Sequence, residues 1–237
     1  MPLVSELGRS MPNTSDATAA LARSRPTAHV ILIGDSVFDN GAYVAGGPDV
    51  VRQLRECLPA GWRATLRAVD GATSADIAGQ LEQLPKDATH LVLSVGGNDA
   101  LGYVGVLEDT ANSIASAVAR LADIADDFAQ VYRAMVAIVL ARRLPTVICT
   151  IYEPRFPDPR LQRFGVTALK LFNDLIVREA FARGVPLLDL RLICDRDEDY
   201  ANPIEPSLKG GGKIAAAIHR VLAEHDFAAE RTHVFVR

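Results

Sequence analysis

Features that would assign a protein to many functional classes are scarce in this chain of 237 residues. The only cysteines are 3 widely separated residues without a C-x-x-C pair, Cys57, Cys149 and Cys194. This count excludes a disulfide framework or a zinc knuckle and predicts free thiols in a reducing compartment. We therefore expect no metal site, and no residue constellation for an organic cofactor is present.

Strong charge and long apolar runs are also missing. The formal net charge is −4, and no basic block or Lys/Arg stripe is present, which argues against nucleic-acid binding. No apolar run of about 18 residues occurs, and the first 29 residues lack the apolar core of a signal peptide. We therefore predict a cytoplasmic protein with no membrane partner.

The composition is that of a soluble globular protein, with 49% hydrophobic and 23% charged residues. The length suits one full-sized α/β domain. We predict a flexible N-terminal arm at residues 1–27, a single domain at residues 28–226 and a C-terminal tail at residues 227–237. The oligomeric state is left open by the sequence.

From residue 29 onward, short apolar runs alternate with amphipathic segments. Continuous apolar runs are typical of buried parallel strands, and apolar residues spaced by three or four are typical of helices. We predict five strands, at residues 29–34, 63–69, 89–97, 145–152 and 185–190. We predict helices at residues 48–58, 74–84, 109–142, 161–183 and 207–224, with Asp109 capping the third. The alternation indicates a parallel sheet covered on both faces.

Polar residues directly follow these strands. Ligands of an open parallel sheet bind beyond the carboxyl ends of its strands. The residues that this edge is expected to bring together are Asp35, Ser36, Asp39, Asn40, Asp70, Gly71, Asn98, Asp99, Tyr152, Glu153 and Arg155, joined by Glu205 ahead of the last helix. We therefore predict the functional site at this edge.

The sequence blocks at these loops resemble those of the SGNH (GDSL-type) hydrolases. They read IGDSVFDNG, VDGATSADI, SVGGND and NPIEPSLKGGGKIAAAI, in the family's order, over residues 30–218. A lone G-D-S would be a weak signal, but its combination with a loop glycine and G-x-N-D is specific. The resemblance implies a three-layer α/β/α sandwich with a flavodoxin-like five-stranded parallel sheet. It also implies esterase, thioesterase, lipase or deacetylase activity.

The resemblance assigns a role to each matching residue. Ser36 matches the nucleophile, and the oxyanion donors are its own N–H, the N–H of Gly71 and the side-chain amide of Asn98. Glycine lets an N–H group approach an oxyanion without a side chain in the way. Loss of one oxyanion donor typically costs about 3 kcal/mol of transition-state stabilisation.

Three further residues are assigned supporting or substrate-binding roles. Asp35 is expected to bond N–H groups of its own loop. Asp99 either supports the site or, with Asn98, closes the strand in an Asx turn. Arg155 either clamps a carboxylate or phosphate of the substrate or is an ordinary surface arginine.

The chain departs from the family in its last block. The family has D-x-x-H-P-S there, in which the histidine is the general base and the aspartate orients it. Here Asn202 and Glu205 stand at these positions, and the Pro-Ser pair is retained. The chain's own histidines are poorly placed to substitute, because they precede strands or lie far along the last helix; only His233, in the tail, is left open.

Glu205 has three alternative interpretations. It is the general base itself, with a pKa raised by burial toward 6–7 and with Asn202 or a loop group orienting it. Alternatively, the site binds a ligand without reacting, or Glu205 is purely structural. We favour hydrolysis of a small ester, thioester or acetylated metabolite through an acyl-serine, and an acyltransferase would use the same residues.

Overall fold

The computed structural model describes residues 27–236, so the predicted N-terminal arm lies outside the described residues apart from Thr27. A six-stranded sheet forms the centre, with the order β2-β1-β3-β4-β5-β6 and every pair parallel. The strands are β1 (His29–Gly34), β2 (Arg63–Leu66), β3 (His90–Ser94), β4 (Thr146–Cys149), β5 (Leu187–Leu188) and β6 (Val234–Phe235). The order reverses between β1 and β3, as in flavodoxin-like sheets, which confirms the predicted fold class.

The sheet has six strands where five were predicted. The additional strand lies in the segment set apart as a tail, where the Leu187 N–H donates to the His233 carbonyl at 2.9 Å and the Asp189 N–H to the Phe235 carbonyl at 2.9 Å. A strand of two residues is too short to show a periodic pattern, so it could not be recognised in the sequence.

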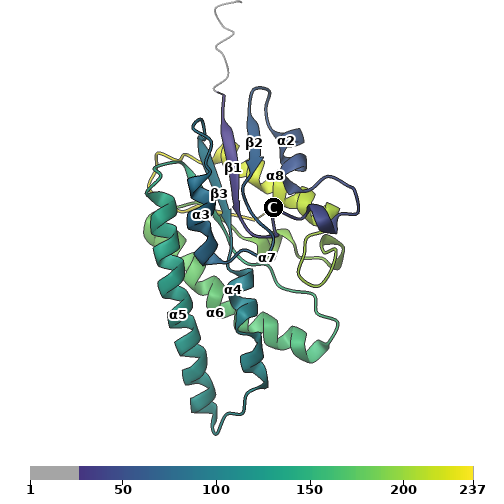
Figure 1. The fold of residues 1–237 in the computed structure, drawn as a ribbon, viewed down its shortest axis with the longest axis vertical. Helices are drawn as coiled ribbons and strands as arrows, with labels where there is room; N and C mark the ends of the chain where they lie inside the picture. Colours follow the sequence, from purple (N-terminus) through teal and green to yellow (C-terminus); the bar gives the residue numbers. More distant parts are fainter. Residues whose placement is uncertain (1–26, 237) are drawn as a thin grey trace, which may run out of the picture.

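Helices cover both faces of the sheet (Figure 1). The helices are α2 (Val50–Cys57), α3 (Ile77–Glu82), α4 (Gly97–Gly102), α5 (Ile114–Leu140), α6 (Pro159–Arg183), α7 (Leu190–Ile193) and α8 (Leu208–Glu224). Short 3₁₀ segments connect them: η1 (Gly41–Tyr43), η2 (Ser74–Asp76), η3 (Val104–Glu108) and η4 (Asp197–Asp199).

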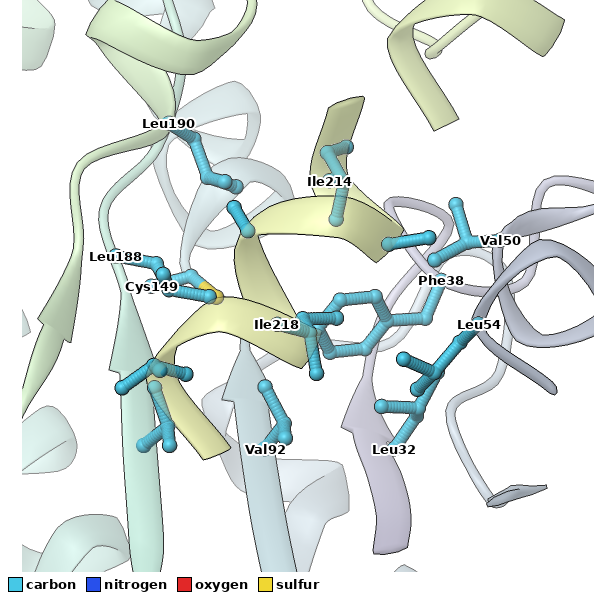
Figure 2. Close-up of a cluster of buried hydrophobic side chains, with 14 of the residues drawn as sticks. Leu32, Phe38, Val50, Leu54, Val92, Cys149, Leu188, Leu190, Ile214 and Ile218 are labelled. Carbon is cyan, nitrogen blue, oxygen red and sulfur yellow. The ribbon is translucent and has the colours of Figure 1, made fainter. Parts of the chain in front are cut away.

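Alternate residues of each strand enter two separate cores. Val30 and Leu32 of β1 pack with α2, α7 and α8, whereas Ile31 and Ile33 pack with α3, α5 and α6. Figure 2 shows the first core, in which Ile218 of α8 lies over the strands. Because both faces of every central strand are buried, the strands are apolar at successive positions, which is why they were recognisable in the sequence.

Helix α5 begins later than predicted. Ser113 caps it and forms a capping box with Ser116, while Asp109 instead ends η3. Asp109 still approaches the helix through an ion pair with Arg120 at 2.6 Å. The prediction placed the helix cap at Asp109 and therefore started the helix too early, directly after the 3₁₀ segment η3.

The amino-terminal half of α5 extends beyond the sheet, and the preceding segment, α4 and η3, lies beside it (Figure 1). Ile114 and Val118, at the start of this helix, are 86% and 57% exposed. The helix enters the core only from Ile124 onward. The projecting part therefore lies at the carboxyl edge of the sheet, where the site was predicted.

Helix α8 approaches its neighbours through three consecutive glycines. A Cβ added to Gly210 would lie 2.1 Å from the carbonyl oxygen of Asp199, which is backbone that cannot move aside. A Cβ added to Gly212 would meet only the end of the Gln53 side chain, at 2.8 Å. The first glycine is therefore required by packing, and the last is not.

We predict that Gly210→Ala lowers the free energy of unfolding by about 3 kcal/mol, because the added methyl group forces α8 away from η4. Gly212→Ala is the matched control and should be neutral or up to about 1 kcal/mol stabilising, because alanine favours the helix. Urea unfolding followed by circular dichroism measures both. Equal effects of the two substitutions would contradict the packing argument.

Candidate active site

The turn after β1 is built around a glycine that no other residue can replace. Gly34 has a φ of +134°, and a Cβ there would lie 1.8 Å from the carbonyl oxygen of Ser94 on β3. The side chain of Gln80 on α3 binds both sides of Gly34, accepting from its N–H at 2.8 Å and donating to its carbonyl at 2.8 Å. These contacts hold Asp35 and Ser36 at the end of β1, next to the reversal of strand order.

Asp35 is buried within this turn. Its N–H donates to the Ser94 carbonyl at 3.1 Å, and its Oδ1 accepts from the Val37 N–H at 3.1 Å. Burial raises the pKa of Asp35 to about 8, the bond from Val37 opposes the rise, and the charge of Glu205 adds to it. At neutral pH the Asp35 carboxyl is therefore largely protonated, and it bonds its own loop as the sequence analysis expected.

Asn98 connects the loops that follow β2 and β3. Its Nδ2 donates to the Ala72 carbonyl at 2.9 Å, so one of its two amide hydrogens fixes the neighbouring loop and the other is left for a ligand. Gly71 precedes Ala72 with a φ of +80°, and an added Cβ would meet nothing within 4 Å. Glycine at position 71 is thus favoured by the backbone angle rather than by lack of space.

Glu205 is held by its own loop. The Oδ1 of Asn202 accepts from the N–H groups of Ile204 and Glu205, both at 2.9 Å, and the Tyr152 hydroxyl donates to the Ile204 carbonyl at 2.6 Å. Asn202 therefore orients Glu205 through the backbone, as an Asx turn, and this bond leaves the carboxyl free. The Glu205 side chain is consequently presented to the cavity by a fixed backbone.

The Glu205 carboxyl faces the hydroxyl of Ser36. Burial raises the pKa of Glu205 to about 7, the side-chain hydrogen bond with Ser36 opposes the rise, and the negative charge of Asp70 adds to it. The residue is only 5% exposed, and its Oε2 has no hydrogen-bond partner within residues 27–236. A carboxyl with this pKa exchanges a proton readily near neutral pH, as a general base must.

Ser36, Asp35, Asn98 and Glu205 line one end of a cavity of about 120 Å³. The walls continue away from the sheet along α4, η3, α5 and α6, and they are almost entirely apolar. The structure thus brings together four of the residues predicted for the site. Gly71 lies in the adjoining loop and is not part of the cavity wall.

Two predicted supporting residues turn away from the cavity. Asp99 accepts the Ser74 N–H at 3.0 Å, and burial raises its pKa. Arg155 forms an ion pair with Asp197 at 3.1 Å and lies 4.8 Å from the centre of the Tyr200 ring. These contacts hold loops together, and the geometry does not bring Arg155 to the cavity as a substrate clamp.

The structure also answers the question left open for the tail histidine. His233 immediately precedes β6, at the amino edge of the parallel sheet and opposite the site. Its Nδ1 lies 3.4 Å from Nδ1 of His225. The geometry therefore leaves Glu205 as the residue in the position of the base.

Gln80 is a site residue that the sequence analysis missed, and Tyr152 was placed at this edge without a contact being predicted for it. Both act on backbone atoms of other loops, at separations of 46 and 52 residues. Neither belongs to a block shared with the family, so only the spatial arrangement identifies these two contacts. Within the described residues, no group of three or more His, Cys, Asp or Glu could hold a metal ion, and no helix is long and apolar enough to cross a bilayer.

Comparison with protein families agrees with this geometry. The GDSL-like lipase/acylhydrolase family matches residues 32–219, which is most of the chain. The chain therefore belongs to this family, which places it among the ester-hydrolysing enzymes. A search of curated proteins returns no match.

Several solved structures share the fold. The extracellular lipase from Streptomyces rimosus has 15% identity and a TM-score of 0.58, over 84% of this chain and 100% of that one. Phospholipase A1 from Streptomyces albidoflavus NA297 has 15% identity and a TM-score of 0.59, over 85% of this chain and 100% of that one. A carbohydrate acetylesterase from Sinorhizobium meliloti has 15% identity and a TM-score of 0.58, over 83% and 99%. At these identities the likeness concerns the fold alone.

The raised pKa of Glu205 predicts a pH-dependent cost in stability. The folded-state pKa of about 7 lies above the ordinary value of 4.5, so the folded protein holds this proton more tightly than the unfolded chain. The resulting stabilisation is complete below about pH 4.5 and is lost as the pH rises through 7. We therefore compare the free energy of unfolding of Glu205→Gln with that of wild type at each pH. The difference should shift in favour of the variant by on the order of 2 kcal/mol between pH 5 and pH 8.

Denaturant unfolding at the two pH values measures this difference. Glu56→Gln, at an exposed position of α2, is the control and should show no pH-dependent gain. A pH-independent effect of Glu205→Gln would show that the Glu205 carboxyl is not perturbed in the folded protein.

Proposed function

We propose that the protein hydrolyses carboxylic esters through an acyl-serine on Ser36, with Glu205 as the general base. The observation that carries the proposal is the contact between the Ser36 hydroxyl and a buried carboxyl whose pKa is about 7. A carboxylate at its ordinary pKa would be a feeble base for a hydroxyl. Burial brings Glu205 close to the working pH, where proton transfer is most efficient.

In the acylation step, the Ser36 Oγ attacks the ester carbonyl carbon while its proton passes to the Glu205 carboxylate. The negative charge that leaves Glu205 develops on the former carbonyl oxygen. The free amide hydrogen of Asn98 and the N–H groups of Ser36 and Gly71 are the proposed donors to that oxygen. Collapse of the intermediate breaks the bond to the alcohol oxygen, which takes the proton from Glu205 and leaves.

In the deacylation step, water replaces the alcohol. Glu205, again a carboxylate, accepts a proton from the water as its oxygen attacks the acyl carbon. Collapse returns the proton to the Ser36 oxygen and releases the carboxylic acid. An acyltransferase would differ only in using another hydroxyl in place of water, and a thioester would differ only in its leaving group.

The charge pattern of the site is consistent with glutamate in this role. When histidine is the base, proton transfer creates a cation, which an acidic partner stabilises. When Glu205 is the base, proton transfer creates a neutral acid, and an aspartate at position 202 would add unfavourable negative charge. Asn202 supplies an oxygen that orients the loop and carries no charge.

We predict that hydrolysis of p-nitrophenyl butyrate rises with pH through an apparent pKa near 7, because Glu205 acts in its ionised form. Glu205→Gln should lower kcat by roughly 10²- to 10⁴-fold and remove the rising limb. Ser36→Ala should abolish turnover. Initial rates from pH 5 to 9 measure all three.

Labelling of Ser36 by a fluorophosphonate tests the same hydroxyl without a choice of substrate, because only an activated serine reacts. Glu205→Gln should slow labelling, and Glu56→Gln should not. If wild type neither turns over esters nor labels, the site binds ligands without catalysing a reaction. If Glu205→Gln keeps full activity and its pH profile, another group is the base.

A further inference from the structure

We propose that the apolar arm of the cavity takes a linear aliphatic acyl chain of about eight carbons, and that Ala168 on α6 helps to set the accepted length. This inference deepens the proposed function and depends on it for the position of the ester carbonyl at Ser36. It names the chemical class of the acyl group, which neither the family nor the fold specifies.

The distribution of polar groups in the cavity is the first observation. Among the described residues of its wall, the carboxyl side chains are those of Asp35 and Glu205, both at the sheet edge, and Lys, Arg and His are absent. Beyond Asn98 the wall is formed mainly by aliphatic and aromatic side chains, including Leu101, Val106, Leu107, Leu121, Ile124, Leu161 and Phe172. A sugar or a charged acyl group would lose its hydrogen bonds to water there without gaining partners. An alkyl chain would gain from burial.

The second observation is the length of the wall. The residues of α6 that line the cavity are spread from Leu161 to Phe172. This stretch is roughly 16 Å long at 1.5 Å per residue. An extended chain advances about 1.2 Å per bond, so an octanoyl group needs roughly 9 Å. The wall is thus long enough for an octanoyl chain, and an acetyl group would leave most of it unoccupied.

Small residues on α6 leave this space open. Gly165 and Ala168 are one turn apart and both line the cavity. A Cβ at Gly165 would lie 3.1 Å from the Phe156 ring, so this ring lies directly on the helix backbone. Ala168 is the position where a larger side chain would enter the cavity with the helix unchanged.

Polar residues outside the cavity wall lie near Glu205. The Tyr43 hydroxyl donates to Asp70 at 2.6 Å, and the Asp70 N–H donates to Asp39 at 3.0 Å. The charge of Asp70 reaches Glu205, which places this polar group beside the site. An ester therefore fits with its acyl chain in the apolar arm and its alcohol toward the polar rim.

The test compares p-nitrophenyl acetate and octanoate as substrates below their aggregation limits. Wild type should have a kcat/KM at least tenfold higher for octanoate than for acetate. Ala168→Leu should lower the octanoate-to-acetate ratio at least tenfold by filling the arm. Ala182→Leu, at an exposed position of the same helix, is the matched control and should leave the ratio unchanged. Val104→Phe, in the part of the cavity wall that η3 forms, is the second variant if Ala168→Leu does not fold.

A binding measurement separates this inference from the proposed catalysis. Ser36→Ala should bind octan-2-one at least tenfold more tightly than butan-2-one in calorimetry, and adding Ala168→Leu should remove the difference. If wild type is inert but this binding pattern holds, the proposed catalysis is contradicted and the proposed acyl-chain site is supported. If wild type is active but prefers acetate, and Ala168→Leu does not change the octanoate-to-acetate ratio, the proposed acyl-chain site is overturned and the proposed catalysis is supported. If wild type is inert and the binding preference for octan-2-one is also absent, both the proposed catalysis and the proposed acyl-chain site are overturned.

Discussion

The arrangement of the whole site depends on how closely β1 approaches β3 at Gly34. No side chain can stand between these strands, because a Cβ there would lie 1.8 Å from the Ser94 carbonyl oxygen. The approach directs the chain into the turn that carries Ser36, and the Asp35 N–H closes that turn on the same carbonyl at 3.1 Å. Since strand order reverses at this point, the loops after β1 and β3 diverge and leave a crevice between them. The nucleophile and Asn98 lie on its two sides.

Much of the fold could be predicted because its buried parallel strands are apolar at successive positions and its helices are periodic. What escaped prediction was short or non-local. β6 has two residues, η3 separates Asp109 from the helix it was expected to cap, and β5 is shorter than its apolar run. Of the site, Ser36, Asn98 and Glu205 were recognisable from sequence blocks. The clamp of Gln80 on Gly34 and the cavity walls were not, because they arise from contacts between distant segments.

The replacement of histidine by glutamate changes the electrostatics of the site more than its shape. Two carboxyl groups, Asp35 and Glu205, share one poorly solvated space, and each is harder to ionise than it would be in water. Glu205 ionises first, and its charge then helps to keep Asp35 protonated. Once Glu205 is ionised and while Asp35 is still protonated, this pair of carboxyls holds one negative charge, and that charge can move between Glu205 and a reacting oxygen without any change in the total. The surrounding neutral groups, Asn98 and Asn202, suit a site with this fixed charge.

The way α5 begins has a consequence for the local stability of the cavity wall. Its first turns bury little apolar surface, with Ile114 86% and Val118 57% exposed, and an exposed ion pair such as Asp109–Arg120 contributes less than about 1 kcal/mol. The free energy of local opening therefore falls steadily from the core toward Ser113, in the way that amide hydrogen exchange reports along a fraying helix. Leu121, part of the cavity wall, lies within this weakly held stretch. Local opening of the first turns of α5 would thus expose Leu121 to solvent while both cores stay folded.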